Sequence, residues 1–374
     1  HTRCSRDWSS DVCSSDLIYL LFRQLYEYQN LKGLIIVPTT SLVEQLYSDF
    51  ADYANNDTFN VPENVHRIYQ GKERHTNKPL TISTWQSLYK MEPEYFEQFD
   101  YVIGDEAHNF KAQSLTTILT SCVNTKYRIG LTGTLDGTKT HKLVLEGLFG
   151  PVKTVTTTKE LIDNNQISPL NIKCLVLKHP EDIAEQAKDW TYQEEIQYLI
   201  KCEDRNRFIR NLAISLDKNS LVLYQLVDKH GKLLYDMIKE KANGRQVFFV
   251  HGGVEAEDRE EIRSIMEKEN DAIVVASYGT FSTGINIRNL HNIIFASPSK
   301  SRIRNLQSIG RGLRQSDGKE QATLYDIADD LRHKKRMNFT LQHFVERAKI
   351  YNEEKFPFKI YNIGLKNGNS NSKI

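Results

Sequence analysis

The four residues DEAH at positions 105–108 carry the side chains best suited to chemistry. They follow a short apolar run, so Asp105 and Glu106 are expected directly after a buried strand, where open parallel sheets bind their ligands. A carboxylate there can hold Mg²⁺ through its water shell, and the next can orient or deprotonate an attacking water. Two solvated acids at the start of a helix would suit the helix dipole equally well, but the extension to Ala107 and His108 is much rarer.

Two arginines three residues apart, Arg311 and Arg314, form a second group of candidates. In the stretch QSIGRGLR at residues 307–314 they share one face of a predicted helix. Guanidinium groups are planar and permanently charged, which suits a triphosphate, and an arginine from a second domain can stabilise a transferred phosphoryl group. Solvated surface arginines are the commoner case, but the nearby Gly310 and Gly312 would let a phosphate come close.

Loops rich in hydroxyls and glycine follow two further predicted strands. LTGT at residues 131–134 places Thr132, Gly133 and Thr134 where they can couple a nucleotide site to another domain, although taken alone it is a capped turn. SYGTFSTGIN at residues 277–286 offers hydroxyls and backbone N–H groups of the kind that contact phosphates. A polar turn would have the same composition.

Apolar runs that alternate with amphipathic stretches define the elements that would position these groups. Helices are predicted between strands, for example at residues 18–28 and 42–53. Because strands alternate with helices, we expect parallel sheets and two α/β domains. Strands are predicted at residues 34–38, 80–84, 101–106 and 128–134, and again at 221–224, 247–250, 272–277, 292–297 and 322–327.

Domain boundaries are predicted from a polar stretch within residues 156–180. We expect the first domain at residues 18–160 and the second at 161–335. Residues 336–374 would form an amphipathic helix at 339–356, which packs on the second domain or recruits a partner, and a disordered tail.

Composition is that of an ordinary globular protein, with 374 residues of which 39% are hydrophobic and 26% charged. The net charge of +1 neither favours nor excludes nucleic acid, because acidic faces can cancel a basic groove. No apolar run approaches the roughly 20 residues of a membrane span, and the cysteines show no disulfide or metal-ligand spacing. We therefore expect a cytoplasmic protein without a membrane partner.

The order of the motifs is more specific than any one of them. IIVPTTSLVEQ, TISTWQSL, DEAH, LTGT, STGIN and QSIGRGLR follow one another within residues 18–330. This order resembles that of superfamily 2 helicases of the DEAH-box type, and VASYGTFSTGINIRNLH and IIVPTTSLVEQL are most similar to the UvsW-type phage helicases. The resemblance implies two RecA-like domains and ATP-dependent remodelling of branched DNA or R-loops in phage repair and recombination.

The resemblance also implies a role for each matching residue. Asp105 would hold the Mg²⁺ of bound ATP, Glu106 would activate water, and Arg311 would reach the γ-phosphate in a cleft between the two domains. Asn286 stands where an aspartate is frequent, so no charge is predicted at that position. The other residues expected to serve ATP are Arg314, Gln307, His108, Gly284 and Asn286, and those expected to line the groove of a DNA strand are Pro38, Thr39, Thr40, Thr84, Trp85, Gln86, Ser277 and Tyr278.

This resemblance indicates only the class of nucleic acid that the protein would bind. Branched or single-stranded DNA is the expected partner, and RNA in RNA–DNA hybrids is an alternative. Trp85 could equally pack in the core, since a tryptophan after a buried strand usually does. The resemblance further implies a monomer in the cytoplasm of a bacterial host.

Such a motor requires a loop of the form Gly-x-x-x-x-Gly-Lys-Ser/Thr, which cradles the phosphates of ATP. This motif does not occur among the 374 residues. Its expected place holds DWSSDVCSSDL at residues 7–17, which resembles a translated sequencing adaptor; a divergent natural N-terminus is the alternative. We set residues 1–17 aside as non-native. The first domain is therefore predicted to lack its first strand and phosphate loop, and this polypeptide alone is expected not to hydrolyse ATP at a useful rate.

Two rival hypotheses remain open. A double-strand DNA translocase of a restriction or remodelling system would share every motif, but it would leave a simple fork paired. A non-hydrolysing nucleic-acid-binding module would have no physical need for Asp105, Glu106, Arg311 and Arg314 together. Under that hypothesis Glu106→Gln would change nothing.

Overall fold

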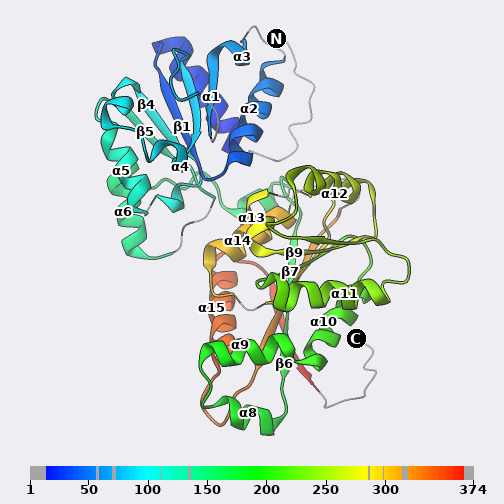
Figure 1. Cartoon of the computed structure of the whole chain (residues 1–374). Helices are drawn as coiled ribbons and strands as arrows, with labels where there is room; N and C mark the ends of the chain where they lie inside the picture. The colour runs from blue at the N-terminus through cyan, green and yellow to red at the C-terminus, as the bar shows by residue number, and fades with distance from the viewer. Residues whose placement is uncertain are drawn as a thin grey trace. The chain divides into compact units, whose positions relative to one another are not determined.

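The computed structural model describes residues 14–55, 59–69, 73–110, 112–133, 135, 137–284, 287–297, 299–313 and 319–365. The chain divides into two compact units, the first at Val12–Val155 and the second at Thr156–Ile374 (Figure 1). The division lies five residues before the boundary expected from the sequence. Each unit is described by itself.

The first unit contains a sheet in which all described strands are parallel, in the order β2-β3-β1-β4-β5. The four strands predicted from the sequence are present as β1, β3, β4 and β5, and the short β2 was not predicted. The strands are β1 (Gly33–Val37), β2 (Val65–Ile68), β3 (Leu80–Thr84), β4 (Tyr101–Gly104) and β5 (Tyr127–Gly130).

Helices cover both faces of this sheet, as the continuous apolar strands require. Ile35 and Val37 of β1 pack with α1 and α2, whereas Leu34 and Ile36 pack on the other face with α5 and α6. Helix α1 begins at Ser14, so residues 14–17, which we expected to be non-native, form its first turn. The helices are α1 (Ser14–Gln29), α2 (Thr40–Ala54), α3 (Val61–Asn64), α4 (Trp85–Leu88), η1 (Pro93–Gln98), η2 (Ala107–Asn109), α5 (Gln113–Ser121) and α6 (Lys139–Phe149).

The second unit also contains a parallel sheet, with the described strands in the order β12-β6-β11-β10-β7-β9-β8. The five predicted strands are present as β7 to β11. Strands β6 and β12 were not predicted, and β12 falls in the segment for which a helix and a tail were expected. The strands are β6 (Leu170–Lys178), β7 (Ser220–Tyr224), β8 (Val247–Val250), β9 (Ile273–Ser277), β10 (Asn292–Phe295), β11 (Ala322–Asp330) and β12 (Phe358–Gly364).

Two groups of helices cover the faces of the second sheet (Figure 1). Val274 and Ala276 of β9 face a cluster that includes α13, α14 and α15, and Ile273 and Val275 face α10 and α11. The C-terminal helix α15 therefore packs on this unit, one of the two roles expected for it. The helices are α7 (Thr158–Asp163), α8 (Glu181–Ala187), α9 (Tyr192–Lys201), α10 (Glu203–Ser215), η3 (Val227–Gly231), α11 (Lys232–Lys241), α12 (Ala256–Lys268), α13 (Tyr278–Gly284), α14 (Arg302–Gly312) and α15 (Phe339–Glu353).

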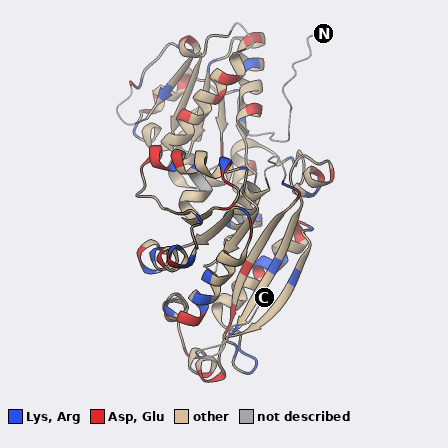
Figure 2. Cartoon of the chain, turned by 90° about the vertical axis from the view of Figure 1, so that its right-hand side faces the viewer, with Lys and Arg blue, Asp and Glu red and all other residues tan. Residues whose placement is uncertain are grey.

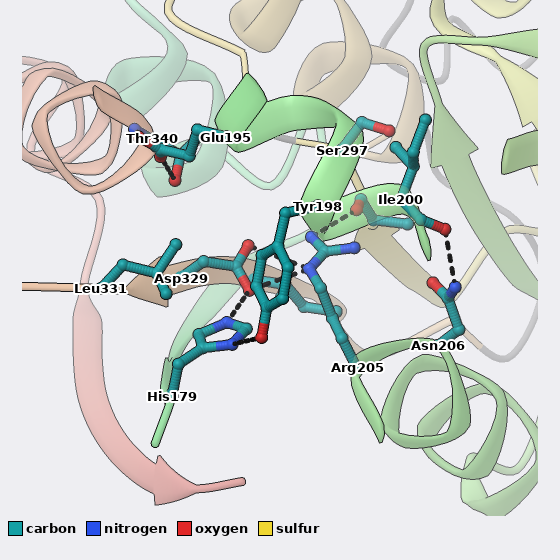
Figure 3. Close-up of polar contacts among 12 residues, drawn as sticks. His179, Glu195, Tyr198, Ile200, Arg205, Asn206, Ser297, Asp329, Leu331 and Thr340 are labelled. Carbon is teal, nitrogen blue, oxygen red and sulfur yellow. Dashed lines mark hydrogen bonds and ion pairs between the residues drawn. The ribbon is translucent and has the colours of Figure 1, made fainter. Parts of the chain in front are cut away.

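A buried polar network joins the helices of the second unit to its sheet (Figure 3). Arg205 of α10 donates from Nε to both carboxylate oxygens of Asp329 on β11, at 2.8 and 3.0 Å. The ring of His179 reaches the same carboxylate at 3.0 Å. Burial opposes charge on Asp329, but Arg205 and His179 lower its pKa to about 2. The buried charges are therefore paired, as a low-dielectric interior requires.

The neighbouring His230 makes the stability of the second unit dependent on pH. It is 1% exposed, its Nε2 lies 3.1 Å from Asn206 Oδ1, and burial lowers its pKa to about 3. A histidine with a lowered folded-state pKa contributes stability that is present above its unfolded pKa of about 6.5 and is lost as the pH falls towards 3.

We therefore expect acidification from pH 6.5 to pH 4 to cost the wild-type chain about 3 kcal/mol more than it costs His230→Asn. This difference is measured by urea unfolding at a series of pH values, monitored by the hydrogen exchange of β7 amides. His251→Asn, which changes a half-buried histidine of the same unit, is the control and should keep the wild-type pH dependence. Equal slopes for His230→Asn and wild type would contradict the assignment.

Candidate functional site

Asp105 and Glu106 lie where β4 ends, at the carboxyl edge of the first sheet. The backbone N–H of Asp105 donates to Ile36 O of β1 at 3.0 Å, and that of Ala107 donates to Leu131 O at 2.8 Å. Glu106 has φ 50° and ψ 50°, a left-handed conformation that costs a residue with a side chain roughly 1–2 kcal/mol. Such strain concentrates at functional sites. The Asp105 side chain is buried, whereas that of Glu106 is about one-third exposed at 32%.

His108 joins the acidic pair to the LTGT segment. Its Nδ1 lies 3.0 Å from Thr132 Oγ1 and 3.2 Å from Glu106 Oε2. His141 Nε2 of α6 lies 3.0 Å from the backbone oxygen of His108 and holds that turn in place. The structure thus brings Glu106, His108 and Thr132 together, and it adds His141, which no sequence pattern singled out. The coupling role of Thr132 and Gly133 stays a prediction, and Thr134 lies outside the described residues.

The residues expected to line a nucleic-acid groove in the first unit come from two adjacent strand ends. Val37 of β1 is in register with Thr84 of β3, so residues 38–40 and 84–86 lie side by side at the carboxyl edge. Local structure uses several of their polar groups. Thr39 Oγ1 caps α2 by accepting from Leu42 N at 3.3 Å, and Thr84 Oγ1 lies 3.0 Å from Ser87 Oγ.

Trp85 and Gln86 differ in how far they are available to a ligand. The Trp85 ring is partly buried against the core of the first unit, which is the packing role left open by the sequence. Gln86 is exposed, and its Nε2 lies 3.5 Å from the backbone oxygen of Pro38. Contact of these residues with nucleic acid stays a prediction.

The candidates that follow β9 in the second unit are mostly enclosed. Ser277 Oγ lies 2.8 Å from Thr280 Oγ1 and is 9% exposed. Tyr278 is 2% exposed and donates to Ser297 O at 3.3 Å, so its backbone alone could fulfil the predicted contact with nucleic acid. Gly284 is the last residue of α13, and Asn286 lies outside the described residues.

Helix α14 carries the arginine motif. Ser301 caps it by accepting from Arg304 N at 3.3 Å, and Gln307 on it is half-buried. A Cβ at Gly312 would lie 2.1 Å from Ile293 Cδ1, so this glycine serves the close approach of α14 to β10 rather than access for a phosphate. The backbone of Arg311 lies in α14, but its side chain and the whole of Arg314 fall outside the described part.

Family models match both units. The model for the res subunit of type III restriction enzymes matches residues 12–137, and that for the helicase conserved C-terminal domain matches residues 204–316. The chain is 33% identical over 359 residues to the ATP-dependent DNA helicase uvsW of Enterobacteria phage T4, covering 92% of this chain and 71% of that protein. The chain belongs to the UvsW family of superfamily 2 helicases. The family predicted from the order of motifs is therefore confirmed, and so is membership in a class of ATP-dependent enzymes that act on nucleic acid.

Solved structures confirm the fold predicted for this helicase. The type ISP restriction-modification enzyme LlaBIII, solved bound to DNA, matches with a TM-score of 0.68 at 15% identity, over 95% of this chain and 29% of that one. Dbp5 of S. cerevisiae, solved with RNA and ADP BeF3, matches with a TM-score of 0.61 at 12% identity, over 96% and 84% of the two chains. None of the helices in the described residues combines the length and hydropathy needed to cross a bilayer.

The described residues of this UvsW-family helicase fit the acidic half of a site for a nucleotide and Mg²⁺, the half that holds the metal ion. Magnesium in such sites is held by one or two carboxylates together with phosphates and waters, and Asp105 can supply one such oxygen ligand at the edge of the sheet. The lysine-bearing phosphate loop does not occur in the 374 residues. No residue of this chain is therefore assigned to cradle the phosphates.

Proposed function

We propose that this chain forms the motor of an ATP-dependent DNA helicase that remodels branched DNA or R-loops in phage repair and recombination. The observation that carries the proposal is the hydrogen-bonded contact of Glu106, His108 and Thr132 at the edge of a parallel sheet, in a chain 33% identical to a DNA helicase of phage T4. The proposed setting is a monomer in the cytoplasm of the host.

Within this proposal each residue of the acidic motif has a separate task. Bound Mg²⁺ would neutralise charge on the phosphates of ATP. Asp105 would bind it, and Glu106, whose side chain is partly exposed, would accept the proton of the attacking water. His108 would keep Glu106 oriented and transmit its position to Thr132. Gln307, Arg311, Arg314, Gly284 and Asn286 would contact ATP from the second unit.

The proposed path of the DNA uses the strand ends of the first sheet. Residues 38–40 and 84–86 lie at adjacent strand ends, and contacts there would be made to the phosphate backbone, which makes binding independent of sequence and sensitive to salt. Ser277 and the backbone of Tyr278 would do the same in the second unit.

Strand displacement tests this function in what we call the loop-extended chain, in which residues 18–374 follow a first strand and a Gly-x-x-x-x-Gly-Lys-Ser/Thr loop from a related helicase. We expect ATP-dependent separation of a forked duplex and of a three-way junction, with the junction processed faster. ATP hydrolysis without separation of the fork would favour a double-strand translocase and contradict the proposal. Loss of salt-sensitive DNA binding would contradict every nucleic-acid function.

A further inference from the structure

A run of basic residues forms an exposed turn between β11 and α15, which we call the basic turn (residues 332–336). The backbone N–H groups of His333 and Arg336 each donate to the other's oxygen, at 3.3 and 3.0 Å. Lys334 at its tip has φ 53°, and the side chains of Arg332, Lys334, Lys335 and Arg336 are exposed. Backbone hydrogen bonds shape the tip of the turn, which leaves the side chains of Lys334 and Lys335 available to a ligand.

The acids around the basic turn do not neutralise it. Arg332 is held by Asp330, with its Nη2 at 2.6 Å from Oδ2, and Arg336 lies at the 4.0 Å limit of an ion pair with Asp189. Within the described residues Lys334 and Lys335 make no ion pair. Figure 2 shows that basic and acidic residues are otherwise interspersed over the unit, so this excess of positive charge is a local feature.

A cavity of about 240 Å³ adjoins the basic turn. Trp190, Met337 and Phe339 give it apolar walls, and Arg336 and Lys188 are at its border. Its volume is below the roughly 300–1,000 Å³ typical of pockets for drug-sized ligands. It therefore suits a single flat ring system rather than a whole cofactor.

Three polar side chains of this cavity, those of Glu195, Asn338 and Gln342, already have hydrogen-bond partners in the protein. Glu195 of α9 accepts from Asn338 Nδ2 at 2.8 Å and from Phe339 N at 2.9 Å, and so caps α15. Gln342 Nε2 donates to Met337 O at 3.0 Å. A ring in the cavity would therefore be held by stacking and apolar contact, and its polar edge would make few hydrogen bonds to the protein. Binding of this kind does not depend on the base sequence.

Aromatic side chains continue the surface beyond the cavity. Tyr192, which is 38% exposed, packs with its ring centroid 5.4 Å from that of His343 and 6.1 Å from that of Phe339. Helices α9 and α15, which carry these residues, lie side by side in Figure 1. A cationic turn next to an aromatic surface is the combination that binds single-stranded nucleic acid.

We propose that the basic turn and the adjoining cavity form a binding site for single-stranded DNA on the second unit, separate from the strand ends proposed above. Lys334, Lys335 and Arg336 contact successive phosphates, and one unstacked base enters the cavity beside Trp190. A paired duplex cannot offer such a base, so the site selects a displaced strand. This inference rests on the proposed DNA helicase function.

The triple variant Lys334→Ser/Lys335→Ser/Arg336→Ser tests the site through the salt dependence of binding to a fluorescent oligo(dT). Each phosphate contact contributes roughly 0.7 to the slope of log affinity against log salt for single strands. We expect the slope of the triple variant to fall by about 2 and its affinity at low salt to fall about tenfold or more. The thermal midpoint should not change, because the substituted side chains are exposed.

The control variant Lys232→Ser/Lys239→Ser/Lys241→Ser removes the same charge from exposed positions of α11 and should keep the wild-type slope. If the triple variant also keeps it while wild type binds oligo(dT), the inference is overturned and the helicase proposal stands. If wild type itself does not bind oligo(dT), the helicase proposal fails with it.

Photocrosslinking of 5-iodouracil-containing oligo(dT) locates the base. We expect crosslinked peptides that contain Trp190 or Phe339, and their loss in the triple variant. Crosslinks confined to the strand ends of the first unit would overturn the site. Binding of duplex as tight as that of the single strand would overturn the proposed selection.

Discussion

Replacing Glu106 with glutamine in the loop-extended chain is expected to lower the rate of ATP hydrolysis by roughly 10²–10⁴-fold, the usual contribution of a positioned general base. The amide has the size of the carboxylate but cannot accept the proton of the attacking water. The turn should persist, since backbone hydrogen bonds hold Asp105 and Ala107. A coupled-enzyme assay at saturating oligo(dT) measures the rate.

The affinities of the Glu106→Gln chain for nucleotide and for DNA distinguish a loss of catalysis from misfolding. Both should stay within about twofold of wild type, because Glu106 is assigned to the chemical step alone. Glu97→Gln makes the same chemical change at an exposed position of the first unit and should leave the rate unchanged. Undiminished hydrolysis by Glu106→Gln would remove the assigned base and with it the central role of the DEAH segment.

The largest expected effect on stability comes from Arg347→Met. Arg347 of α15 is 1% exposed and donates from Nε and Nη2 to Asp326 of β11, at distances of 2.8 to 3.1 Å. Removing the guanidinium leaves the fully buried carboxylate of Asp326 with the hydroxyl of Tyr351, at 2.8 Å, as its remaining charge-stabilising donor among the contacts described. Breaking a buried ion pair in this way costs about 3–5 kcal/mol.

Urea unfolding monitored by hydrogen exchange of β11 amides measures this loss in the second unit. The double variant Asp326→Asn/Arg347→Met is the matched control, because it removes both charges and should recover part of the lost stability. Lys349→Met breaks an ion pair on the same helix in which both side chains are exposed, and it should cost no more than about 1 kcal/mol. A cost for Arg347→Met as small as that of Lys349→Met would contradict the proposed anchoring of α15 by the Arg347–Asp326 pair.

Local pattern predicted the central strands of both sheets but not their edges. β1, β9 and β10 are buried along their whole length and consist mainly of apolar residues, so the sequence displays them as short apolar runs. β12 is largely exposed at the edge of its sheet, and β6 mixes half-buried positions with buried ones. Their pairing depends on a neighbour about 180 residues away in the chain, which a local pattern cannot express.

The candidate site was predictable in part for the same reason. Asp105, Glu106 and His108 lie within four residues of the chain, so the sequence displays them together, and the structure adds the contact of His108 with Thr132. His141 and the Arg205–Asp329 pair, 124 residues apart in sequence, emerge only from folding. Tyr278 was predicted to contact nucleic acid, but its ring is buried and packs against Phe295, so that prediction now concerns its backbone alone.

DNA-stimulated ATP hydrolysis, measured side by side for the 374-residue chain, the loop-extended chain and its Glu106→Gln form, tests the central claim most directly. The account predicts turnover by the loop-extended chain alone. Turnover by the 374-residue chain would show that phosphates are cradled without a Gly-x-x-x-x-Gly-Lys-Ser/Thr loop. An inactive but folded loop-extended chain, or an active Glu106→Gln form, would contradict the assignment of Asp105 and Glu106 as the acidic half of an ATP site.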